Sequence, residues 1–204
     1  TIDGVNVYHS RIIAGKALAE SYPVEADLVV GVPDSGLVAA KGYSEQSGIP
    51  YGMAFHKNSY VGRTFIKPKQ SDRESSVKIK LNVIPEVVKG RIVMVDDSIV
   101  RGTTCANIIK MLKKAGATEV HVRISSPPFL HPCYFGTDVP SNEQLIAHSH
   151  TPEQIRDMIG ADSLGYMEIE KLKNMVGDLH FCDACFTGNY PMEVPGEDIS
   201  QAFE

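Results

Sequence analysis

Several features are absent from this sequence of 204 residues. No run of apolar residues is long enough to cross a membrane, and no signal peptide is visible. There is no internal repeat and no low-complexity segment. An excess of basic residues is also missing, because the formal net charge is −5, whereas general nucleic-acid binders normally carry a basic face. We therefore expect a cytoplasmic protein that binds neither membranes nor nucleic acids.

Cysteine is scarce, and its use in a reducing compartment favours metal binding or chemistry over disulfides. Two of the cysteines form a CxxC pair, which suits a metal or a redox switch and is only moderately specific by itself. The apolar fraction of 43% is that of an ordinary soluble globular protein. The four positions are Cys105, Cys133, Cys182 and Cys185.

Strands and helices alternate along the first part of the chain, which predicts an α/β fold with a mainly parallel central sheet flanked by helices. We assign residues 1–127 to this core and residues 128–204 to a short helical extension that carries cysteines. Apolar patterning predicts strands over residues 27–32, 51–55, 77–81, 91–96 and 119–125, and helices over residues 9–22, 37–47, 102–115, 141–149, 152–159 and 168–175.

The stretch RIVMVDDSIVRGTT, from Arg91 to Thr104, joins a buried-looking strand to two adjacent carboxylates. The continuous apolar run is typical of a strand covered on both faces. In parallel sheets, ligands bind at the carboxyl ends of the strands. Asp96 and Asp97 lie at such an end, and Asp34 and Ser35 follow another predicted strand. These two strand ends are therefore the predicted ligand site.

The loop from Ser98 to Thr104 has the features of a phosphate cradle. Gly102 allows the backbone to come close to a bound group, and the helix that follows offers free N–H groups and the positive end of its dipole. Two threonine hydroxyls and Arg101 add donors and charge. Carboxylates repel phosphate, so their expected role is to accept hydrogen bonds from sugar hydroxyls or to hold Mg²⁺. A phosphorylated ribose with a metal-bound diphosphate fits all of these features; the alternative is a solvent-facing acidic turn before an ordinary capped helix.

The segment KNSYVGRTFIKPK, from Lys57 to Lys69, is polar, basic and contains glycine. It predicts a long loop, and long loops in compact domains are often functional. The alternative is a basic loop that is simply solvated.

The motif VMVDDSIVRGTT resembles the phosphoribosyl pyrophosphate (PRPP) binding signature of type I phosphoribosyltransferases. Four further motifs resemble one family, glutamine PRPP amidotransferase or amidophosphoribosyltransferase, in its iron–sulfur-bearing branch. The resemblance implies displacement of diphosphate from PRPP by ammonia to give 5-phosphoribosylamine, the first committed step of purine nucleotide biosynthesis. The motifs are GVPDSG at 31–36, KNSYVGRTFIKP at 57–68, HPCYFGTD at 131–138 and CDACFTGNYP at 182–191.

The resemblance also implies roles for individual residues. Mg²⁺ would be associated with Ser35, Asp96 and Asp97, and the turn at Asp34 and Ser35 would approach the diphosphate. A flexible loop would close over PRPP, and cationic side chains on it would stabilise the leaving diphosphate. The catalytic set is Lys57, Arg63, Asp96 and Asp97, and the other substrate-binding residues are Asp34, Ser35, Tyr60, Ser98, Arg101, Gly102, Thr103 and Thr104.

In the family branch that the sequence resembles, four thiolates hold a four-iron four-sulfur (4Fe-4S) cluster. Carried over, the resemblance implies Cys133, Cys182 and Cys185 as three ligands, with the fourth expected upstream of Thr1. Cys105 matches no ligand position, and packing is its expected role. Zinc is the alternative metal for the CxxC pair.

The family also has an N-terminal glutaminase domain, which we expect this chain to lack. We therefore expect the chain alone to use free ammonia at most, while the intact enzyme would deliver ammonia from glutamine. The resemblance further implies feedback inhibition by purine nucleotides and a homo-oligomer, a tetramer. The alternatives are a salvage phosphoribosyltransferase that uses a free base, and a non-catalytic regulator that senses PRPP.

Overall fold

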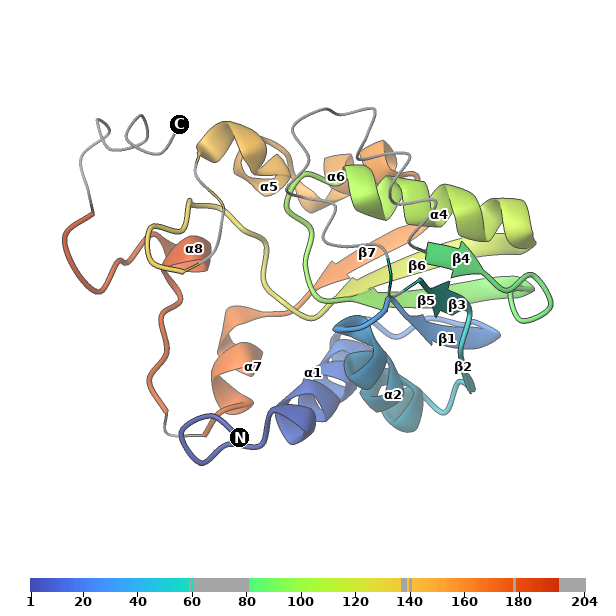
Figure 1. The fold of residues 1–204 in the computed structure, drawn as a ribbon, viewed down its shortest axis with the longest axis horizontal. Helices are drawn as coiled ribbons and strands as arrows, with labels where there is room; N and C mark the ends of the chain where they lie inside the picture. Colours follow the sequence, from blue (N-terminus) through green and yellow to red (C-terminus); the bar gives the residue numbers. More distant parts are fainter. Residues whose placement is uncertain (59, 61–80, 137–138, 140, 178, 195–204) are drawn as a thin grey trace.

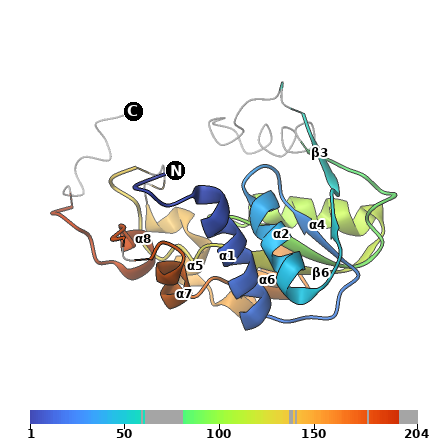
Figure 2. The same cartoon turned by 90° about the horizontal axis from the view of Figure 1, so that it is seen from below.

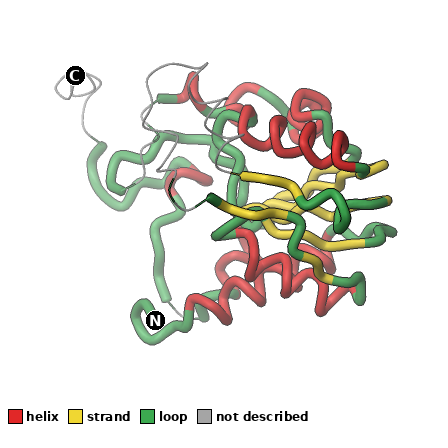
Figure 3. Tube along the Cα trace, turned by 45° about the vertical axis from the view of Figure 1, so that its right-hand side comes forward, coloured by secondary structure: helices red, strands yellow, loops and turns green. Residues whose placement is uncertain are grey.

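The computed structural model describes residues 1–58, 60, 81–136, 139, 141–177 and 179–194, and Figure 1 shows their arrangement. A parallel sheet with the strand order β2-β1-β5-β6-β7 lies between two layers of helices, which Figure 3 shows from another side. The mainly parallel α/β fold predicted from the sequence is confirmed. Its strands are β1 (Leu28–Gly31), β2 (Tyr51–Gly52), β5 (Gly90–Asp96), β6 (Ala117–Ile124) and β7 (Ser163–Tyr166).

One face of the sheet is covered by α1 (Val7–Ser21) and α2 (Gly36–Ser47), which lie side by side in Figure 2. Two glycines let these helices touch backbone to backbone. A Cβ atom on Gly15 would lie 1.9 Å from the Ala39 carbonyl oxygen, and one on Gly42 would lie 2.2 Å from the Ile12 carbonyl oxygen. A short helix, α7 (Ile169–Asn174), packs beside α1 on the same face.

The opposite face is covered by α4 (Thr103–Ala115) and α6 (Pro152–Ile159). Helix α4 buries one stripe with helical spacing, namely Cys105, Ile108, Ile109 and Leu112. Helix α6 begins with a capping box in which Thr151 and Gln154 satisfy each other's backbone N–H groups. Both helices pack on the apolar side chains of β5 and β6, which form the larger core cluster.

Most predicted elements of the core are confirmed to within two residues at their ends. The helix predicted over residues 141–149 is interrupted, because a 3₁₀ turn (Asn142–Gln144) and α5 (Ile146–Ser149) are separated by an extended Leu145. The strand predicted over residues 77–81 lies outside the described residues apart from Leu81, which begins β4 (Leu81–Val83).

Two expectations about strands are wrong. The segment 51–55 is two strands, because β2 joins the parallel sheet while β3 (Phe55–Lys57) pairs antiparallel with β4 in a second sheet. The alternation also does not stop at residues 126–128, since β7 extends the main sheet beside β6. Its sequence SLGY is too short and too mixed for a strand pattern, and only the exposed edge of β6 makes it one.

The end of the described chain folds back onto the segment that follows β6. The short helix α8 (Ala184–Thr187) contains Cys185, whose carbonyl oxygen accepts the N–H groups of Leu130 and His131 at 2.9 and 3.1 Å. The Phe129 and Phe186 rings lie 5.1 Å apart between centroids. Among the residues described, no helix is both long enough and apolar enough to cross a membrane.

Candidate active site

Two turns meet at the carboxyl edge of the sheet, one after β1 and one after β5. The strands are in register with Gly31 opposite Val95, and the Val32 N–H donates to the Val95 carbonyl oxygen at 2.9 Å. Contact is close because Gly36 has no side chain: a Cβ there would lie 2.5 Å from the Val95 oxygen. The turn bearing Asp34 therefore lies beside the one bearing Asp96, as the sequence predicted.

The adjacent carboxylates differ in their surroundings. Asp96 is half-buried, and its Oδ1 accepts the Asp97 N–H at 2.8 Å. Burial raises the pKa of Asp96 well above its usual range, and the charge of Asp97 raises it further. Asp97 is exposed and accepts the Ser98 hydroxyl at 3.1 Å. A divalent cation at this pair would favour the charged form of Asp96.

The side chains at this edge offer oxygen atoms, which are the donors that Mg²⁺ prefers. Within the described part of the chain, no group of three or more histidine, cysteine, aspartate or glutamate side chains is placed to hold a metal. Mg²⁺ is often held by only one or two carboxylates together with substrate phosphates and water. The pair at Asp96 and Asp97, with the Ser35 hydroxyl on the neighbouring turn, fits that mode of binding.

The loop after Asp97 leads into the N-terminus of α4. Gly102 caps the helix with a left-handed backbone, φ +78°, and no side chain caps the first N–H groups. Thr103 and Thr104 are exposed on the first helical turn. The N-terminus of α4 carries these donors and the positive end of the helix dipole, which is the arrangement expected for an anion site.

Residues from the extension brace this loop. The Ile146 N–H donates to the Val100 carbonyl oxygen at 2.9 Å, and Arg101 hydrogen-bonds the Gln144 side chain. A Cβ on Gly102 would lie 2.9 Å from the Ile146 Cδ1 atom. Sequence reasoning missed Gln144 and Ile146, because only the fold brings α5 against the loop.

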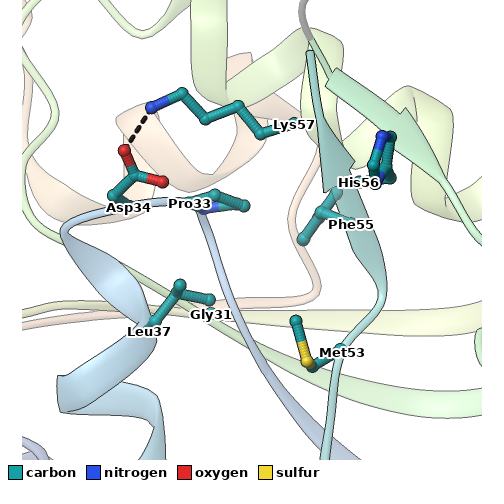
Figure 4. Close-up of a pocket in the computed structure, with 8 residues that line it drawn as sticks. All are labelled: Gly31, Pro33, Asp34, Leu37, Met53, Phe55, His56 and Lys57. Atoms are coloured by element: carbon teal, nitrogen blue, oxygen red, sulfur yellow. Dashed lines mark hydrogen bonds and ion pairs between the residues drawn. The ribbon is translucent and has the colours of Figure 1, made fainter. Parts of the chain in front are cut away.

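A pocket opens beside the first turn and is shown in Figure 4. Its volume of about 170 Å³ is smaller than that of most ligand sites. Lys57 on β3 reaches across to the Asp34 carboxylate and forms an ion pair. The Pro33–Asp34 peptide bond is cis. The lining residues are Gly31, Pro33, Asp34, Leu37, Met53, Phe55, His56 and Lys57.

The structure thus brings most of the predicted site residues to one edge of the sheet. Tyr60 is fully exposed. Among the described residues, its side chain forms no hydrogen bond with either turn, and its backbone N–H donates to the Asn58 side chain. Arg63 lies outside the described residues, so its role stays a prediction. The pocket residues Met53 and His56 were not predicted from the sequence. The one feature that could have indicated them is that they come just before Lys57 in the sequence.

The three cysteines outside the core lie in the folded-back end of the chain. Cys133 and Cys185 are half-buried and Cys182 is exposed. Burial raises the pKa of Cys185 to about 11, and the nearby thiols of Cys133 and Cys182 add to the shift. Thiolates are the donors that iron–sulfur clusters require. These three supply part of a set of four, and within the described residues they are not placed together as a metal-binding group.

Cys105, by contrast, is 4% exposed and belongs to the larger core cluster. Burial raises the pKa of its thiol, so the thiolate is disfavoured. The expectation that Cys105 serves packing is confirmed.

This fold and its paired turns define a phosphoribosyl transferase domain, and the family model of that description matches residues 8–125. The amidophosphoribosyltransferase of Archaeoglobus fulgidus is 55% identical in an alignment of 202 positions, which covers 97% of this chain and 44% of that protein. That of Bacillus subtilis is 54% identical over 200 residues, 95% of this chain and 42% of that protein. The chain belongs to the amidophosphoribosyltransferase family.

Two solved structures agree. Glutamine PRPP amidotransferase from B. subtilis, complexed with ADP and GMP, matches with a TM-score of 0.84 and 52% identity over 97% of this chain. A structure described as the allosteric regulatory enzyme of purine biosynthesis matches with a TM-score of 0.85 and 53% identity, also over 97% of this chain. The chain spans 45% and 44% of these chains, less than half of their length. The salvage enzyme and the non-catalytic sensor are not favoured by these relatives.

Proposed function

We propose that this chain is the phosphoribosyltransferase part of an amidophosphoribosyltransferase. It binds PRPP and Mg²⁺ at the carboxyl edge of the sheet and displaces diphosphate with ammonia to form 5-phosphoribosylamine. The observation that carries the proposal is the register of β1 and β5, which sets Asp34 and Ser35 beside Asp96 and Asp97 at the entrance of the phosphate loop. In the intact protein, a glutaminase domain would supply the ammonia.

Each part of the substrate has a matching part of the site. The N–H groups and hydroxyls at the start of α4 suit the 5-phosphate. Asp96 and Asp97 accept hydrogen bonds from the ribose hydroxyls or hold the cation. When bound, Mg²⁺ supplies positive charge that offsets the charge growing on the departing diphosphate. Lys57 supplies further positive charge on the side of the pocket facing Asp34.

The proposal extends to regulation and assembly through the relatives. One relative is described in complex with ADP and GMP, and we propose that purine nucleotides also inhibit this protein. Phosphate groups of a nucleotide would find the same donors at α4 as PRPP does. A cytoplasmic homotetramer stays our expectation for the intact protein.

We further propose that Cys133, Cys182 and Cys185 are ligands of a 4Fe-4S cluster in the intact protein. The support is the donor chemistry of thiolates and the electrostatic effect of Cys133 and Cys182 on Cys185. The test is iron and sulfide content, with an optical spectrum, of a chain extended upstream and purified without air. A colourless, iron-free protein would overturn the cluster and leave the PRPP site untouched.

The test of the proposed reaction is diphosphate release from PRPP by the purified chain, with Mg²⁺ and ammonium chloride at pH 8. We expect release to rise with ammonia concentration and to give no product with free purine or pyrimidine bases. Release driven by a free base and not by ammonia would contradict the proposal. Glutamine in place of ammonia is the control, and we expect no release with it from these 204 residues alone.

A further inference from the structure

Two buried hydroxyl groups near the site have no hydrogen-bond partner in the described part of the chain. Tyr166 ends β7 and is 5% exposed, and its hydroxyl is unpaired among the described residues. The Ser126 hydroxyl, just beyond β6, is also buried and has no hydrogen-bond partner among the described residues. Burial of an unpaired hydroxyl is unfavourable, and such groups in native proteins usually bind an internal water or a ligand.

The sheet register places Tyr166 on the same face as Asp96. Asp96 is opposite Ile124 on β6, and Ile124 is opposite Tyr166 on β7. Residues in register on neighbouring parallel strands point to the same face, here the one covered by α4 and α6. Ser126 lies two residues beyond the end of β6, and the N–H of Met167, the residue after Tyr166, donates to the Ser126 carbonyl oxygen at 3.2 Å, so the backbone of Ser126 lies next to the end of β7.

The backbones of Asp96 and Tyr166 are far apart, and a water between the two side chains could connect them. Two strand spacings separate their Cα atoms by about 9 to 10 Å. Cys105 on α4 packs in the same core cluster as Tyr166. In addition to burial, the charge of Asp96 raises the pKa of the Cys105 thiol, and the charge of Cys105 raises the pKa of Tyr166. Asp96, Cys105 and Tyr166 therefore lie near one another on this face of the sheet.

We propose that Tyr166 and Ser126 are positioning residues for Asp96, and that their hydroxyls hold a buried water behind its carboxylate. Oδ1 of Asp96 already accepts the Asp97 N–H, so a hydrogen bond from the water to the other oxygen would fix the rotamer. The water accepts from the Tyr166 hydroxyl and donates to Asp96 and to Ser126. The inference rests on the proposed function, in which Asp96 accepts hydrogen bonds from the sugar hydroxyls or holds the cation.

The chain offers a matched pair of substitutions. Tyr166→Phe removes the unpaired hydroxyl, and Tyr43→Phe removes a paired one, since the fully buried Tyr43 donates to the Tyr22 carbonyl oxygen at 2.9 Å on the opposite side of the sheet. We expect Tyr166→Phe to weaken PRPP binding with Mg²⁺ by about fivefold and leave stability to urea nearly unchanged. Tyr43→Phe should lower stability to urea and leave PRPP binding nearly unchanged.

A second substitution tests the shared water. Ser126→Ala should also weaken PRPP binding, and the double variant with Tyr166→Phe should be no weaker than the worse single variant, because both act through one water. Equal PRPP affinities of wild type and Tyr166→Phe would overturn the inference and leave the proposed function intact.

If the wild-type chain does not bind PRPP, the proposed function fails, and a crystal structure at high resolution decides the structural part. A water within hydrogen-bond distance of both the Tyr166 hydroxyl and the Asp96 carboxylate would support the inference. A dry site between them would overturn it.

Discussion

Lys57 forms an ion pair with Asp34, 23 residues earlier in the chain, across the mouth of the pocket between β1 and β3. The lysine that is expected to stabilise the diphosphate is therefore already engaged by a carboxylate. The Asp34 side chain is 71% exposed, and ion pairs of exposed groups contribute little to stability. A diphosphate carrying several charges can replace Asp34 as the partner of Lys57.

Substitution of Lys57 should therefore affect binding much more than folding. We expect Lys57→Gln to weaken the binding of PRPP by about tenfold or more, because a charge facing the diphosphate is lost, and to change the free energy of unfolding by less than about 1 kcal/mol. Calorimetry and urea denaturation measure the two quantities. Lys41→Gln is the matched control, because Lys41 pairs with Glu45 on α2, away from the site. Equal effects of the two variants on affinity would contradict the role of Lys57.

Asp96→Asn should separate the folding role of this residue from its binding role. Burial raises the pKa of Asp96, so its charged form is disfavoured in the unliganded protein. The amide oxygen of asparagine can still accept the Asp97 N–H. We expect the free energy of unfolding to stay equal or to rise, while Mg²⁺-dependent affinity for PRPP falls by about a hundredfold. A variant that binds PRPP normally with Mg²⁺ would show that Asp96 is not part of the site.

His121 should make stability depend on pH. It is 6% exposed, its Nδ1 lies 3.0 Å from the Ser163 hydroxyl, and its Nε2 lies 3.1 Å from the Glu119 carboxylate without hydrogen-bond geometry. Burial lowers the pKa of His121, and the charge of Arg123 lowers it further, against the opposite effects of Glu119 and Asp162.

The unfolded chain consequently binds more protons at this histidine than the folded chain does, as pH falls below about 6.5. Stability should decrease with falling pH from that value down to the lowered pKa, and His121→Gln should flatten this part of the profile. Urea denaturation at a series of pH values between 5 and 8 measures it. An identical slope in wild type and variant would contradict the assignment.

Gly15→Ala tests the close contact of α1 and α2. Alanine normally favours a helix over glycine by up to about 1 kcal/mol. Here the added Cβ would lie 1.9 Å from the Ala39 carbonyl oxygen, so the helices must separate. We expect a net loss of about 2 to 3 kcal/mol in the free energy of unfolding. Gly136→Ala is the control, because nothing lies within 4 Å of a Cβ there, and a stabilised Gly15 variant would refute the contact.

The long periodic segments were predictable from the sequence because their pattern agrees with their packing. Helix α4 is an example: its buried stripe follows the helical period, and Gly102 and Gly116 bound it on both sides. Strand β7 was not predictable, because SLGY has no strand pattern and is a strand only through pairing with β6. Residues 51–55 were misread as one strand because a change of sheet at Met53 and Ala54 leaves no mark in apolar spacing.

The site was predictable where chemistry follows a strand directly. Asp96 and Asp97 and the loop after them are set by the end of β5, so their position could be inferred from sequence order. The ion pair of Lys57 with Asp34 and the alignment of Tyr166 with Asp96 depend on β3 and β7, whose places in the fold are set by distant parts of the chain.

The central claim is that the edge of the sheet at Asp34 and Asp96 binds PRPP together with Mg²⁺. The most direct measurement is a calorimetric titration of the folded chain with PRPP, in the presence of Mg²⁺ and again with the cation chelated. We predict saturable binding at one site with Mg²⁺ and a large loss of affinity without it. A well-folded chain that gives no binding heat with PRPP in either condition, across several temperatures, would contradict the account.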